Sequence, residues 1–155
     1  MIATIRLDPC EVAIAKVVAQ FRIDRVESQK LGPGHGELGN GLHRHFPGAA
    51  AELAVAKHFG VYWAGSIESW TGEDVAGLEV RSTKHVGGSL ILYPSDDPDK
   101  NAILVVVLND GAECRLIGTI PIRYGQHVRY SMAGDPRLRP GSPPQFWVPQ
   151  NALLT

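Results

Sequence analysis

Three acidic residues and one cation have the types and spacing that metal-assisted hydrolysis requires. Asp74 and Glu79 flank a small pair at residues 76–77, and Arg81 follows Glu79 by two positions. Glu52 lies upstream in an alanine-rich segment. Carboxylate oxygens are the ligands that Mg²⁺ prefers, and a neighbouring cation stabilises charge that builds up on a phosphate. These residues predict metal-dependent hydrolysis of a phosphodiester.

The two downstream acids are expected to meet across a hairpin. If residues 76 and 77 form a tight turn, Asp74 opposes Glu79, and directly opposed side chains lie about 5 Å apart. Like charges at that distance repel, and a divalent cation would convert the repulsion into a binding site. Glu79 and Arg81 share one strand face because side chains alternate. The alternative is an exposed hairpin whose acids point to water.

Glu52 has small and apolar neighbours at helical spacing, namely Ala49, Val55 and Ala56. Small residues would let this helix approach a sheet closely and direct the carboxylate toward the hairpin acids. The alternative is a glutamate at the rim of the core that pairs with a lysine or an arginine.

The elements that must position these residues are two helices followed by strands. Residues 8–11 carry a helix-start signal, with Asp, Pro and Glu at its first, second and fourth positions. Helical spacing of the apolar residues then continues through Ile14, Val17, Val18 and Phe21, which predicts a helix to about residue 28. A second helix is expected from about residues 46–47 until Gly60 stops it.

Strands are expected after the second helix, and the order of elements predicts the fold class. Expected strands cover residues 61–64, 74–75 paired with 78–83, 89–93 paired with 102–108, and 115–122, with loops at 30–41 and 133–149 and a short segment at 146–148. Helices first and strands afterwards predict an α/β (α+β) fold, in which helices flank a mixed sheet.

Size and composition favour one globular domain over residues 1–155. Apolar residues make up 44% and charged residues 20% of the chain, which excludes a disordered or fibrous protein. The longest apolar runs, such as residues 102–108, are too short to span a membrane. The first six residues lack the features of a signal peptide. Cys10 and Cys114 are far apart and are expected to be free, buried thiols of a cytoplasmic protein.

Arginine is concentrated in the C-terminal part of the chain. Residues 115–139 contain five arginines, one histidine and a single acid, Asp135. The whole chain has ten arginines against five lysines, and the planar guanidinium suits phosphate. This stretch indicates nucleic acid as a partner, with a solvated surface as the alternative reading.

The chain resembles small phage and prophage proteins related to the PD-(D/E)XK nucleases. The likeness rests on short motifs in a set order, found at residues 48–57 with Gly60, 74–75, 79–83, 90–92, 96–99, 116–120 and 146–150. It therefore covers most of the chain from about residue 46. The resemblance implies a restriction-endonuclease-like core, a mixed sheet with flanking helices and an active site at one edge.

The resemblance also implies roles for individual residues. Glu52, Asp74, Glu79 and the backbone carbonyl of Val80 would hold Mg²⁺ or Mn²⁺, which lowers the pKa of a bound water. Arg81 stands where the family has lysine, so it can stabilise charge but cannot act as a base.

A second basic residue lies three positions further along the chain. Lys84 could substitute for the missing lysine, although strand alternation puts it on the opposite face from Arg81.

The implied activity is that of a phage-associated, metal-dependent nuclease acting on nucleic acid, with DNA favoured over RNA. One alternative is a non-catalytic relative that binds nucleic acid and has lost the chemistry. Another is a phage accessory protein that binds a host protein. A homodimer is an open option for the nuclease, because two sites can then reach two strands.

Overall fold

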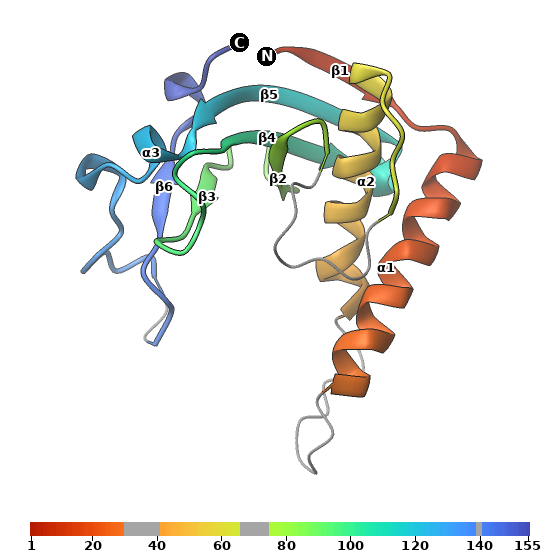
Figure 1. The fold of residues 1–155 in the computed structure, drawn as a ribbon, viewed down its shortest axis with the longest axis horizontal. Helices are drawn as coiled ribbons and strands as arrows, with labels where there is room; N and C mark the ends of the chain where they lie inside the picture. Colours follow the sequence, from red (N-terminus) through yellow and green to blue (C-terminus); the bar gives the residue numbers. More distant parts are fainter. Residues whose placement is uncertain (30–40, 66–74, 139–140) are drawn as a thin grey trace.

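The computed structural model describes residues 1–29, 41–65, 75–138 and 141–155. Its elements are, in chain order, β1 (Ala3–Arg6), α1 (Pro9–Gln29), α2 (Gly41–Phe59), β2 (Leu78–Thr83), β3 (Leu90–Leu92), β4 (Asn101–Leu108), η1 (Asn109–Gly111), β5 (Glu113–Pro121), α3 (Ile122–Gly125), η2 (Val128–Tyr130), β6 (Phe146–Val148) and η3 (Gln150–Ala152). A sheet arches across the molecule, with α1 and α2 at one end and β3, β6 and α3 at the other (Figure 1). The predicted α/β (α+β) class is confirmed.

The central sheet is mixed and has the strand order β1-β5-β4-β2. Strand β4 runs parallel to β2 and antiparallel to β5, and β1 pairs antiparallel with β5. The predicted pairing of residues 89–93 with 102–108 is wrong, because β3 pairs with β6 in a separate small sheet. Both edges of β4 are already occupied by β2 and β5, so no backbone groups remain there for β3.

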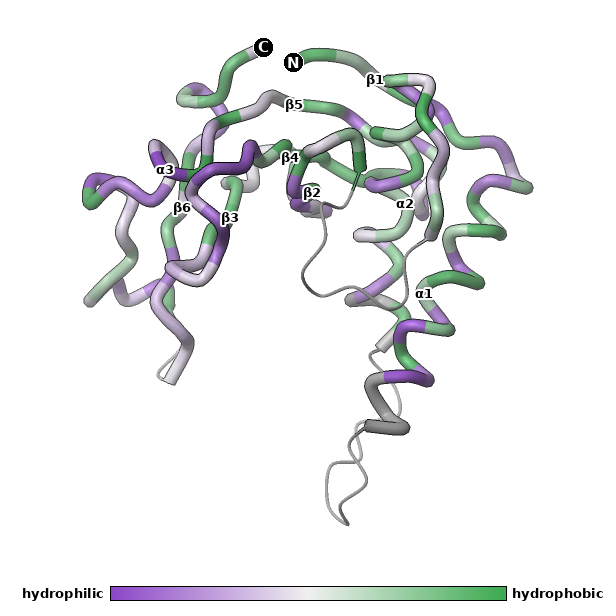
Figure 2. Tube along the Cα trace, in the orientation of Figure 1, coloured by the Kyte–Doolittle hydropathy of each residue, from purple (hydrophilic) through white to green (hydrophobic). Residues whose placement is uncertain are grey.

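Strand alternation gives the sheet two buried faces. Ile103 and Val105 point into a core shared with α1 and α2, called here the helix-side core. Ala102 and Leu104 point into a second core shared with β3 and β6, called here the strand-side core. Hydrophobic residues accordingly dominate β4, whereas the segment around α3 is hydrophilic (Figure 2). No helix in the described part of the chain is long and apolar enough to cross a membrane.

Helix α1 begins as its start signal predicts. The Asp8 and Glu11 side chains accept hydrogen bonds from each other's backbone N–H groups, at 2.9 and 2.7 Å, which is a capping box. Most of the apolar residues that predict the helix do not face the core: Val18 packs against it, whereas Ile14, Val17 and Phe21 are each more than half exposed. Its buried face consists of Ala15, Ala19 and Ile23, which allows close packing against α2.

Helix α2 differs from its prediction at its N-terminus. It begins at Gly41 instead of near residues 46–47, and Pro47 lies inside it. The proline removes one backbone donor, and burial of Phe46 and Ala49 on either side holds the helix continuous.

The C-terminus of α2 follows the prediction. Gly60 has a φ of +65°, and the N–H of Val61 donates to the carbonyl of Ala56 at 3.0 Å, as in a Schellman motif. The strand expected at residues 61–64 is wrong, since this described segment has no regular structure. The strand expected at residues 115–122 is confirmed as β5.

Candidate functional site

The predicted turn at residues 76–77 is confirmed. Val75 and Leu78 form an antiparallel bridge, with N···O distances of 3.3 and 2.9 Å between their backbone groups. Ala76 and Gly77 both have positive φ, +54° and +73°, which is typical of a type I′ hairpin turn. Asp74 lies outside the described residues, so its opposition to Glu79 stays a prediction.

Arg81 lies between two carboxylates. Its Nη2 is 3.1 Å from Oε1 of Glu79 and 2.8 Å from Oδ1 of Asp96. The side chains of these three residues, called here the acid–arginine cluster, are only 28%, 21% and 11% exposed for Arg81, Glu79 and Asp96. Partial burial strengthens such interactions relative to an exposed pair, so the guanidinium is held in one orientation.

Asp96 is the functional candidate that sequence reasoning missed. In the sequence, the acidic turn at residues 96–99 is one of the motifs that resemble the PD-(D/E)XK nucleases. Nothing in the composition of this turn separates Asp96 from its neighbours. In the fold, Asp96 Oδ2 also accepts a hydrogen bond from the N–H of Tyr93 at 2.8 Å. Gln126 fixes the same turn by donating to the carbonyls of Tyr93 and Asp96, at 2.8 and 3.0 Å. Long-range contacts of this kind leave no local sequence signal.

One polar atom of the cluster remains unsatisfied. The Arg81 Nε is buried and has no hydrogen-bond partner among the described residues. A buried guanidinium N–H without an acceptor is costly, typically by about 1–3 kcal/mol. The Arg81 side chain therefore retains a donor for a further acceptor.

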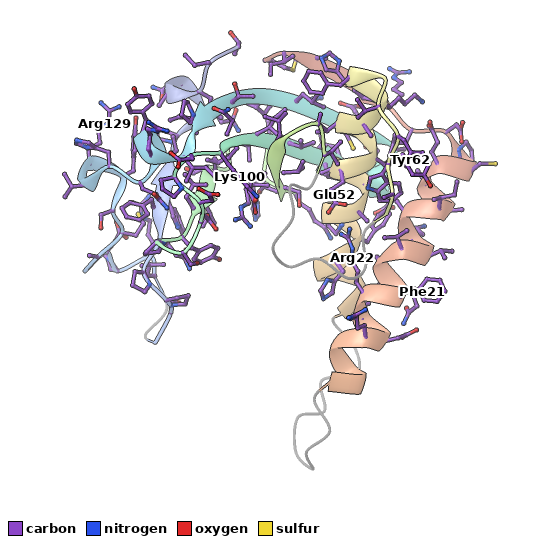
Figure 3. All side chains as sticks on the ribbon, in the orientation of Figure 1. Phe21, Arg22, Glu52, Tyr62, Lys100 and Arg129 are labelled. Atoms are coloured by element: carbon purple, nitrogen blue, oxygen red, sulfur yellow. The ribbon has the colours of Figure 1, made fainter. Side chains whose placement is uncertain are left out.

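Glu52 is buried and fully engaged by other residues. Its two carboxylate oxygens accept a bidentate pair from Arg22 of α1, at 2.8 and 2.7 Å. Trp63 Nε1 adds a third hydrogen bond at 3.1 Å. Glu52 and Arg22 lie at the interface between α2 and α1 (Figure 3). This geometry matches the paired glutamate that the sequence left open as an alternative to a metal ligand.

The structure brings together some of the predicted site residues and separates others. Val80 packs in the helix-side core, so Glu79 and Arg81, on the other face of β2, point away from the α2 layer that carries Glu52. Lys84 is exposed and follows the last residue of β2. In the described part of the chain, no three His, Cys, Asp or Glu side chains lie close enough to hold a metal. Asp74 lies outside the described residues, and the metal-ligand roles therefore stay predictions.

The two cysteines differ in environment. Burial, together with the adjacent Glu113, raises the pKa of the Cys114 thiol to about 12. The expected burial is wrong for Cys10, which lies in the first turn of α1 and is exposed.

A thiol titration tests this difference. Cys114 is buried, and its raised pKa keeps the thiol protonated near pH 8. We therefore expect Ellman's reagent to label one thiol of the native protein and both thiols in denaturant. Cys10→Ser protein should show no fast labelling, whereas rapid reaction of its Cys114 would contradict the packing described here.

Scans against protein-family models, curated proteins and solved structures found no match to this chain. The likeness to PD-(D/E)XK nucleases therefore stays a prediction from the motifs.

Proposed function

We propose that this protein is a metal-dependent nuclease of the PD-(D/E)XK type. The observation that carries the proposal is the acid–arginine cluster, in which Glu79 and Arg81 of β2 follow a type I′ turn and Asp96 comes from the turn before β4. That turn continues the chain back toward Asp74, the residue expected to oppose Glu79. Carboxylates grouped beside an arginine suit a divalent cation and a phosphate.

In this proposal Asp74 and Glu79, with the carbonyl of Val80, hold Mg²⁺ or Mn²⁺. When bound, such a metal would supply a water of lowered pKa. Arg81 stabilises the charge that develops on the phosphate and does not act as a base. Lys84 lies beyond the end of β2 and would contact the nucleic acid as an exposed cation.

Glu52 can act as a metal ligand in this mechanism only if it releases its present partner. Its carboxylate would have to exchange Arg22 for the metal, since both oxygens are paired. The structure gives Glu52 an evident role in joining the two helices, so the proposal assigns ligation first to the residues of the hairpin.

Cleavage of nucleic acid in the presence of metal tests the proposal. Purified protein with Mg²⁺ or Mn²⁺ would be offered plasmid, linear duplex, single-stranded and branched DNA, and RNA. We expect cleavage of at least one DNA substrate, complete inhibition by EDTA, and no cleavage by Glu79→Ala protein purified in parallel. Cleavage that persists in EDTA or in the variant would contradict the proposal.

A second candidate is a non-catalytic nucleic-acid-binding relative of this fold. It is favoured by one observation: Glu52, Glu79 and Asp96 each have an arginine counterion, so these carboxylates are balanced without a metal. This candidate predicts binding that is unchanged by EDTA and by Asp74→Asn, with no cleavage of any substrate.

A further inference from the structure

The segment that follows β5 presents aromatic and cationic side chains to solvent. Tyr124 of α3 is 62% exposed and Val128 of η2 is 78% exposed. Arg129 is exposed and stacks on its neighbour, with its guanidinium carbon 4.6 Å from the ring centroid of Tyr130. Tyr130 itself is partly buried against the strand-side core, so Tyr124, Val128 and Arg129 are called here the stacking surface. They lie at the opposite end of the molecule from α1, as the position of Arg129 shows (Figure 3).

The stacking surface is attached rigidly to the rest of the fold. Ile122, at the start of α3, is wholly buried, and its N–H donates to the carbonyl of Lys100 at 2.9 Å. Gly125 packs so closely that a Cβ there would lie 2.4 Å from Cδ1 of Leu92. Beyond η2, Ser131 bridges to β6 through Phe146. The backbone that carries the exposed Tyr124 ring is therefore held in place by packing, which lowers the entropic cost of binding a ligand there.

The segment itself carries a positive charge, and the acidic turn at residues 96–99 lies against it. Residues 122–134 contain two arginines, one histidine and no acid. Arg123 is paired with Asp99 at 2.7 Å, and Arg137 with Asp135, whose pKa the arginine lowers to about 2. Those two cations are balanced by carboxylates, whereas the Arg129 guanidinium lies over an aromatic ring. An anion at this surface would therefore meet the charge of Arg129.

We infer that the stacking surface binds single-stranded nucleic acid, with a base on the exposed ring of Tyr124 and a phosphate at Arg129. Exposed aromatic rings next to a cation are what non-specific single-strand binding uses, because every base has a face on which to stack. A duplex offers phosphates to Arg129, but its bases are already stacked and paired, so none is available to stack on Tyr124. The chemistry on this surface thus favours unpaired strands.

The surface also connects to the candidate site. Gln126 lies between Tyr124 and Val128 in sequence, and its side chain bonds to the turn that carries Asp96. A strand held on the stacking surface therefore lies beside the element that positions Arg81. This inference rests on the proposed function for the fate of the bound strand, but the binding itself needs no cleavage.

Fluorescence anisotropy tests the inference without catalysis. A fluorescent oligothymidylate of about 20 nucleotides and a duplex of the same length would be titrated with full-length protein in EDTA at low salt. We expect tighter binding of the single strand and about tenfold weaker binding by Tyr124→Ala and by Arg129→Ala. Tyr62→Ala and Arg6→Ala are matched controls, because Tyr62 is 91% exposed and Arg6 is also exposed, both outside the stacking surface.

The outcomes separate this inference from the proposed nuclease. Equal binding by Tyr124→Ala and wild type, equal losses in the control variants, or a preference for duplex would each overturn the stacking surface. Single-strand binding by wild type that fails only in the surface variants would support it. Absence of cleavage with that binding intact would overturn the nuclease and leave the binding surface standing.

Discussion

Glu79→Ala is expected to reduce metal-dependent cleavage at least about 100-fold, because it removes a metal ligand from the proposed site. The same variant should keep its affinity for single-stranded DNA in EDTA, since Glu79 lies on β2 and not on the stacking surface. Initial rates at saturating substrate, measured over a range of Mg²⁺ concentrations, check the first point, and fluorescence anisotropy in EDTA checks the second.

The chain contains a matched control for this variant. Glu113 and Arg115 on β5 repeat the Glu-x-Arg spacing of Glu79 and Arg81, with an ion pair of 2.8 Å and a similarly shielded glutamate. Glu113→Ala removes the same side chain from an equivalent pair outside the acid–arginine cluster, so it should cleave at the wild-type rate. Cleavage at the wild-type rate by both variants would overturn the assignment of Glu79. The same reduction of cleavage in both variants would indicate a general effect of breaking such pairs.

Glu52→Ala is expected to lower the free energy of unfolding by about 3–5 kcal/mol. The Arg22 side chain is only 18% exposed, and removing its bidentate partner leaves a poorly solvated charge at the interface between α1 and α2. Trp63 also loses the acceptor for its indole N–H. For a domain of this size the midpoint of thermal unfolding should fall by roughly 10 °C, measured by calorimetry or circular dichroism.

A solvent-exposed pair provides the comparison. Lys57 and Glu11 are 2.7 Å apart, but the lysine side chain is 41% exposed, so Lys57→Met should cost no more than about 1 kcal/mol. A cost below 1 kcal/mol for Glu52→Ala would show that the buried pair is not structural. A Mg²⁺-dependent rise of the unfolding midpoint in wild type that disappears in Glu52→Gln would instead favour Glu52 as a metal ligand.

Local sequence signals were sufficient wherever the determining contacts lie within a few residues. The capping box of Asp8 and Glu11, the glycine stop at Gly60 and the turn at Ala76 follow from neighbouring residues alone. The proximity of Glu79 and Arg81 also follows, because alternation along one strand puts them on the same face. The α/β (α+β) class came from the order of these elements.

Tertiary structure decided which faces and partners those elements use. Apolar spacing in α1 could not reveal that Ala15 and Ala19 form its buried face, because that depends on how closely α2 approaches. The same packing directed Glu52 to Arg22, thirty residues earlier in the chain.

In the acid–arginine cluster, too, one contact follows from the sequence and another from the tertiary structure. The amino-acid sequence by itself determined the local elements and the pair on β2, since these depend on short-range geometry. Only the fold brought Asp96 to Arg81, fifteen residues away, and attached α3 to the same turn through Gln126. Contacts between distant segments depend on how whole elements pack, and the spacing of residues within one element carries no information about that.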